Sequence, residues 1–119
     1  MNDATKKIQE YGSLHPFDFD MVGRLELVVT PLIQGYTTQL TLRCISSRGE
    51  RKAQVLVLNF EEVRDLKFRA PGAPFQTFLD VRDVSDRQWD RVKYQVLDNE
   101  NAMISFFCND FSFRIEGSI

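Results

Sequence analysis

The stretch 83–116 constrains the fold more than any other part of the chain. It opens with the signals of a short helix: Ser85 is placed as an N-cap, and Gln88 completes a capping box three residues later. Val84 and Trp89 occupy the two positions of a hydrophobic staple around the same turn. We therefore expect a capped helical turn here, with Trp89 packed in the core.

Three apolar-rich segments follow this turn, namely Val92–Leu97, Ala102–Cys108 and Phe111–Ile115. The four residues 98–101 separate the first two segments, and the Asn109-Asp110 pair, which suits a two-residue hairpin turn, separates the last two. This spacing predicts an antiparallel meander of three strands.

Earlier segments also alternate apolar and polar residues, as half-buried strands do. They are Arg24–Thr30, Tyr36–Ile45, Ala53–Phe60, a short strand within Glu61–Arg69, and Phe75–Arg82. Four consecutive apolar residues, Val55 to Leu58, place the Ala53–Phe60 strand centrally, with cover on both faces. Residues 1–20 are predicted to form an N-terminal arm or a short helix, and Phe17 to Met21 an extended edge.

The predicted fold is all-β or β-rich α+β: a single antiparallel domain, residues 1–119, built as a sandwich or partly closed barrel with one or two short helices. A chain of 119 residues buries enough surface to fold without a metal or a disulfide. No apolar run approaches the ~20 residues of a membrane span, and the first residues lack the apolar region of a signal peptide. We expect a cytoplasmic protein with no membrane contact, in which Cys44 and Cys108 are reduced core thiols.

Catalytic and metal signatures are missing from the sequence. His15 is the one histidine, and the two cysteines form no CxxC pair, so a structural zinc site has too few ligands. No EF-hand spacing and no nucleophile beside a base is present. The sequence predicts no catalytic, cofactor-binding or metal-binding residues, and an enzyme is the third choice of function.

Charge is nearly balanced overall, with a net value of −2, but it is unevenly distributed. Residues 80–119 carry five Lys and Arg against eight Asp and Glu, which makes the C-terminal third acidic. Dense basic clusters interleaved with stacking aromatics are missing, so nucleic acid is a disfavoured partner.

Four acidic residues are the predicted partner contacts: Asp86, Asp90, Asp98 and Glu100. Asp98 and Glu100 are expected in a loop between strands, where their side chains reach outward and binding residues often lie. The structural alternative is that Asp86 complements the dipole of the helical turn and that Asp98 favours the chain reversal.

The last third to half of the chain resembles small bacterial proteins of unassigned activity that are grouped with immunity proteins of polymorphic toxins. The resemblance rests on Trp89, Tyr94, the loop 98–100 and the ISFFC run 104–108. It implies a non-enzymatic protein that neutralises a partner protein by covering its active surface.

A second function stays open beside this one. The Phe-rich faces of the predicted strands suit a β module that holds an apolar small molecule of unknown identity. The sequence leaves a homo-oligomer open as well.

Overall fold

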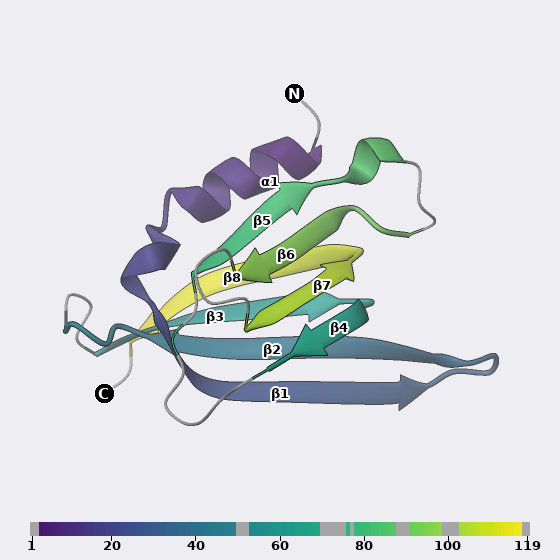
Figure 1. Cartoon of the computed structure of the whole chain (residues 1–119), viewed down its shortest axis with the longest axis horizontal. Coiled ribbons are helices and arrows are strands. Elements are labelled where there is room, and N and C mark those ends of the chain that lie inside the picture. Colours follow the sequence, from purple (N-terminus) through teal and green to yellow (C-terminus); the bar gives the residue numbers. More distant parts are fainter. Residues whose placement is uncertain are drawn as a thin grey trace.

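The protein is described by a computed structural model that covers residues 3–49, 53–69, 76, 78–87, 91–98 and 103–117. Its strands form two four-stranded antiparallel sheets (Figure 1). Sheet A has the order β1 (Met21–Pro31), β2 (Tyr36–Ile45), β3 (Gln54–Glu61) and β8 (Asp110–Gly117). Sheet B has the order β4 (Arg64–Phe68), β7 (Ile104–Cys108), β6 (Tyr94–Asp98) and β5 (Leu79–Asp83). The predicted β-rich antiparallel fold is confirmed, and the described strands do not close into a barrel.

Aromatic rings from both sheets meet in the core. Phe60 of β3 packs edge to face against Phe106 of β7, with ring centroids 4.8 Å apart. Tyr94 of β6 makes the same type of contact with Phe111 of β8, also at 4.8 Å. All four side chains are buried, and such pairs add about 0.5–1.5 kcal/mol each to the free energy of apolar burial. These contacts hold the two sheets face to face.

Strand β3 lies inside sheet A, between β2 and β8, and its residues Val55 to Leu58 are all buried, as predicted. Leu56 and Leu58 face the core, whereas Val57 lies on the outer face between Arg43 and Arg114 in the register. Both arginines bind the Glu116 carboxylate, at 2.9 and 2.8 Å. Charged side chains with long apolar stems therefore cover the outer face in place of a further layer.

The predicted three-strand meander is wrong in its last strand. Strands β6 and β7 pair as expected, but β8 leaves sheet B and pairs with β3. Both edges of β7 are already occupied, by β6 and by β4, so no edge is left for β8. The N–H of Asn109 donates to the carbonyl of Glu61 at 3.0 Å and turns the chain towards sheet A. Asn109-Asp110 is a crossing between sheets and not a hairpin turn.

The N-terminal segment forms a helix, α1 (Asp3–Gly12), which is one of the two predicted alternatives. Lys7 Nζ donates to the Asp110 carboxylate at 2.6 Å and to the carbonyl of Phe111 at 2.8 Å. The buried Tyr11 ring packs against Phe111 and Phe113. The helix thus covers the flank where β5 and β8 end the two sheets (Figure 1).

Two local predictions need correction. The extended edge expected from Phe17 begins instead with a 3-10 turn, η1 (Pro16–Asp18), and β1 starts only at Met21. The helical turn expected near Ser85 is present as the 3-10 turn η2 (Ser85–Arg87). The N–H and the hydroxyl of Ser85 donate to the Asp83 carboxylate, at 2.9 and 2.6 Å, and the capping box of Ser85 with Gln88 stays a prediction. Gln88 and Trp89 lie outside the described residues.

The strand expected over Phe75–Arg82 is shorter and shifted, since β5 covers Leu79–Asp83 and Gln76 makes one isolated bridge to Met21. In the described part of the chain, no helix has the length and apolar character of a membrane span.

Candidate partner-binding surface

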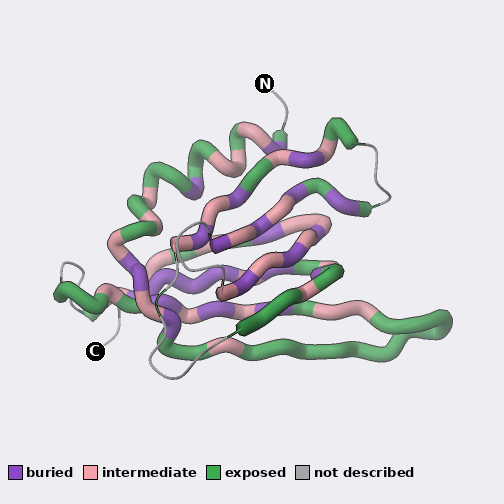
Figure 2. The backbone as a smooth tube through the Cα atoms, in the orientation of Figure 1, coloured by how far each residue is buried: buried purple, intermediate pink, exposed green. Residues whose placement is uncertain are grey.

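The far end of the β1–β2 hairpin carries the largest concentration of exposed apolar side chains. We call this part, residues 27–36, the hairpin arm. It contains six of the nine large apolar side chains that are exposed in the described chain: Leu27, Val28, Val29, Leu32, Ile33 and Tyr36. The hairpin extends beyond sheet B at this end, and Figure 2 shows it as the longest exposed stretch of the backbone. Apolar patches of this kind mark binding surfaces.

The turn of the arm is closed by its backbone and needs none of these side chains. Pro31 pairs with Tyr36 in the register, and the N–H of Leu32 donates to the carbonyl of Gly35 at 2.9 Å. Gly35 has a φ of 89°, which is the conformation that glycine adopts at least cost. Leu32 and Ile33 occupy turn positions that usually hold polar residues. Both side chains are exposed, so they contribute little to the stability of the fold.

Sequence reasoning missed this surface because the alternation of Arg24–Thr30 predicts a half-buried strand. Leu25 is partly buried and contacts the core, but Leu27 and Val29 on the same face are exposed. β1 is the edge strand of sheet A, so Leu27 is exposed although the residue opposite it, Leu40, is fully buried. The signal that was available is the apolar turn Leu32-Ile33 between two alternating strands.

A groove of about 880 Å³ runs between the arm and the start of β4. The N–H of Val63 donates to the carbonyl of Thr38 at 3.0 Å and holds the two sides together. The lining of the groove combines apolar arm residues with charged residues of the opposite wall: Leu27, Val29, Leu32, Tyr36, Thr37, Thr38, Glu62, Val63, Arg64, Asp65, Leu66 and Arg91. This is the mixture of an apolar centre and a polar rim that protein interfaces show.

The charged wall is built from backbone in an uncommon conformation. Glu62, Asp65 and Arg91 have φ values of 52°, 53° and 58°, and they are three of the five described non-glycine residues with positive φ. Such residues cost free energy and cluster at functional sites. Arg91 Nε donates to Glu62 at 2.7 Å, and this hydrogen bond lowers the pKa of the Glu62 carboxyl. The wall therefore presents a fixed ion pair at the rim of the groove.

The predicted acidic contacts do not form one surface in the described chain. Asp98 ends β6 opposite Leu79, whereas Asp86 follows the other end of the same ladder, beyond the pair of Asp83 with Tyr94. Asp86 is exposed, but Asp98 is buried, so the expectation that Asp98 reaches outward is wrong.

The Asp98 carboxylate accepts from the N–H groups of Phe78 and Met103, at 3.4 and 3.5 Å. This is the structural role of a carboxylate at a chain reversal. Asp90 and Glu100 lie outside the described residues.

Both cysteines are free and buried, as predicted. Burial raises the pKa of each thiol to about 12, and for Cys108 the nearby Asp110 carboxylate adds to this rise. A thiol with so high a pKa is protonated at neutral pH and is a poor nucleophile. The cysteines are part of the packing of the core.

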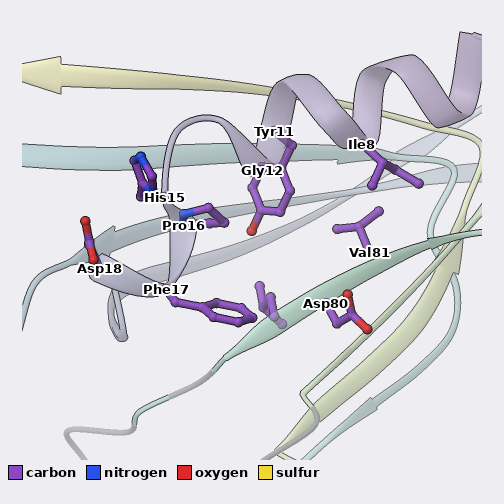
Figure 3. A pocket seen from close by; sticks show the side chains of 10 residues that line it. Ile8, Tyr11, Gly12, His15, Pro16, Phe17, Asp18, Asp80 and Val81 are labelled. Atoms are coloured by element: carbon purple, nitrogen blue, oxygen red, sulfur yellow. The ribbon is translucent and has the colours of Figure 1, made fainter.

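A second, smaller pocket of about 340 Å³ lies under α1 (Figure 3). Its walls come from α1, η1 and β5 and include the apolar side chains of Ile8, Phe17 and Val81. Tyr11 also lines it, and its ring is 5% exposed. Burial raises the pKa of the Tyr11 phenol strongly, and Cys44 and Asp80 contribute further. The hydroxyl has no hydrogen-bond partner among the described residues.

The two antiparallel sheets define a small β-rich fold with one exposed apolar arm. The chain belongs to the family Immunity protein PIM8, whose model matches residues 3–114. This match includes the C-terminal segment that carries the resemblance and extends it over nearly the whole chain. No curated protein and no solved structure matches the chain.

Proposed function

We propose that this immunity protein acts without catalysis, by binding a partner protein and covering the surface through which that partner acts. Membership of an immunity-protein family supports the binding role. The hairpin arm is the observation that supports a protein as the partner, because its apolar side chains are exposed without any need of the fold. We further propose a bacterial protein in a reducing compartment such as the cytoplasm, in keeping with two free cysteines.

The arm and the groove have the composition of a binding hot spot. Tyr36 is 70% exposed and stands beside Leu27 and Val29 at the groove. Tyrosine gives much contact area for little conformational entropy, and the few residues that dominate binding energy are enriched in it. The Glu62–Arg91 pair and Arg64 at the rim supply orientation more than affinity.

The acidic C-terminal surface is the competing contact proposed from the sequence. Among its described members, Asp86 on η2 is the exposed one and lies away from the arm, and Asp90 and Glu100 belong to the same proposal. If the acidic surface is the main contact with the partner, charge reversal at Asp86 slows association, and the association rate loses part of its dependence on salt.

A tagged chain used as bait in lysate of the source cell separates these surfaces. We expect one protein to be recovered with the native chain and with Asp86→Lys, and to be lost with the double variant Leu32→Asp/Ile33→Asp. The recovered protein is then expressed alone and together with the chain. Toxicity that co-expression relieves supports neutralisation, and recovery that survives the double variant overturns the arm as the contact.

The pocket under α1 supports a second candidate, a small-molecule binding module. Its ligand would have an apolar body and one hydrogen-bond acceptor, placed to receive the Tyr11 hydroxyl proton. Native mass spectrometry of the purified chain tests this. A ligand-bound species that becomes less populated in Tyr11→Phe supports the module. Detection of the unliganded chain alone contradicts it.

A further inference from the structure

The outer edge of β1 is an unpaired strand edge. β1 ends sheet A, and its far side pairs with no described residue apart from the bridge of Met21 to Gln76. Past the bulge between Val22 and Arg24, the register with β2 continues without interruption to Pro31. In an antiparallel strand, every second residue points its N–H and C=O groups away from its neighbour. The segment 24–31 thus offers a straight row of free backbone donors and acceptors.

The other three sheet edges are shorter than β1 or lie against α1. The β4 edge is only Arg64–Phe68 long, is irregular between Arg64 and Lys67, and carries three charged residues. α1 lies along β5 (Figure 1), and Lys7 ties it to β8 through Asp110 and the carbonyl of Phe111. Proteins protect sheet edges by shortness, charge, bulges or cover. The β4 edge is short and charged, the β5 edge lies against α1 and β8 is tied to α1 at its start, whereas the edge of β1 is uncovered from Arg24 to Pro31.

Side chains on both faces of this edge are apolar and exposed. Leu27 and Val29, on the face towards the groove, are 45% and 56% exposed, and Val28 on the outer face is 40% exposed. A strand added beside β1 would lie about 4.8 Å away and cover both faces at once. Binding at the groove alone would leave Val28 exposed. The exposure on both faces therefore fits an added strand better than a ligand on one face.

We propose that the bound partner protein contributes an extended segment that pairs with β1 along residues 24–31 and continues sheet A. This inference rests on the proposed function and states how the partner is held. The segment that fits has apolar residues at alternate positions, which pack beside Leu27 and Val29 over the groove. On its other face, an acidic residue meets Arg24 and a basic one meets Glu26. Backbone pairing supplies affinity, and the alternate side chains supply specificity.

A second copy of the chain fits this edge less well than a different protein. Antiparallel self-pairing about a two-fold axis sets residues of one face opposite each other. In the registers that centre the free edge, Leu27 or Val28 faces itself, so Glu26 faces Val28 or Thr30 and never Arg24. In these registers the charges on the edge are not self-complementary, and a partner with the opposite pattern gains what a copy cannot.

Hydrogen exchange of the backbone amides tests the pairing directly. The probe is the partner protein recovered with the tagged chain, mixed with the native chain at saturation. In the free chain, every second amide of 24–30 exchanges fast, and in the complex these fast amides slow by at least tenfold. Proline at position 28 or 29, whichever amide is fast in the free chain, should lower affinity at least tenfold with unchanged circular dichroism, because edge strands tolerate proline.

Matched edge variants complete the test. Val28→Lys should weaken the complex at least tenfold, whereas Phe68→Lys on the β4 edge, which replaces a side chain 47% exposed, should leave affinity unchanged. A complex that forms without slowing the β1 amides overturns strand addition while the proposed function stands. If no partner complex forms, the proposed function fails first. If light scattering shows that the free chain is a dimer and its β1 amides already exchange slowly, the edge pairs with a second copy. This result overturns the proposal.

Discussion

The two ends of the β1–β2 hairpin contain similar residues in very different surroundings. At the base, Leu42 and Cys44 of β2 are fully or almost fully buried in the core. At the arm, Leu27, Val29 and Tyr36 continue the same face and are exposed. Figure 2 shows this change along two neighbouring strands. The same alternation is core where a second sheet covers it and an exposed apolar surface, the proposed contact, where the cover stops.

The largest expected effect belongs to the covered region. Phe106 is fully buried against Phe60, so Phe106→Ala should lower the free energy of unfolding by about 3–5 kcal/mol. Tyr36→Ala in the arm should change it by less than about 0.5 kcal/mol, as surface substitutions do. Urea denaturation measures both. Similar losses for the two variants would show that the arm is part of the stable core.

A smaller effect on stability is expected at the base of the hairpin, where Asp20, just before β1, binds Ser47, just after β2. Its buried carboxylate accepts from the N–H of Ser47 at 2.9 Å and from the Ser47 hydroxyl at 2.8 and 2.7 Å. Because hydrogen bonds to charged groups are worth about 1.5–3 kcal/mol, Asp20→Ala should lower the free energy of unfolding by about 2 kcal/mol. A variant as stable as the native chain in thermal and urea unfolding would refute this.

The same residue predicts a dependence on pH. Burial alone would raise the pKa of Asp20, but the hydrogen bonds from Ser47 outweigh it, so its pKa is lowered in the folded chain. The stabilisation is then complete above the unfolded pKa of about 3.9 and is lost as the pH falls through the lower folded value. The stability difference between the native chain and Asp20→Ala should shrink below about pH 4. A difference that stays constant down to pH 2 would contradict the lowered pKa.

The smallest effect concerns Tyr11, which differs from Tyr36 by being buried. Its hydroxyl has no hydrogen-bond partner among the described residues, and a buried unsatisfied group costs about 1–3 kcal/mol. Tyr11→Phe should therefore keep the free energy of unfolding or raise it by about 1 kcal/mol. A loss of stability in differential scanning calorimetry would reveal a partner for the hydroxyl, such as a bound water or ligand.

The sequence predicts local strands well and their partners less well. Alternation correctly indicates the strand Tyr36–Ile45, and four consecutive apolar residues correctly indicate the interior position of β3. The move of β8 to sheet A could not be predicted, because it depends on β4 occupying the second edge of β7. Pairing between strands distant in the chain has no signal in a local pattern.

The candidate site shows the same limit. Asp98 and Glu100 are predicted contacts because they stand in a polar loop. A carboxylate that forms a turn and one that reaches into solvent look alike in the sequence, and only the burial of Asp98 shows that it has the structural role. The arm is the opposite case. Its alternation is that of a half-buried strand, and the position of β1 at the edge of sheet A leaves Leu27 and Val29 exposed.

One measurement tests the central claim, that the arm binds and does not stabilise. The double variant Leu32→Asp/Ile33→Asp and the control Asp86→Lys are each titrated calorimetrically with the recovered partner, and their urea midpoints are measured on the same preparations. We expect the double variant to lose at least about thirtyfold in affinity, the ~2 kcal/mol of a hot spot, at an unchanged midpoint. Native affinity in the double variant, together with a loss in Asp86→Lys, would contradict the claim and favour the acidic surface.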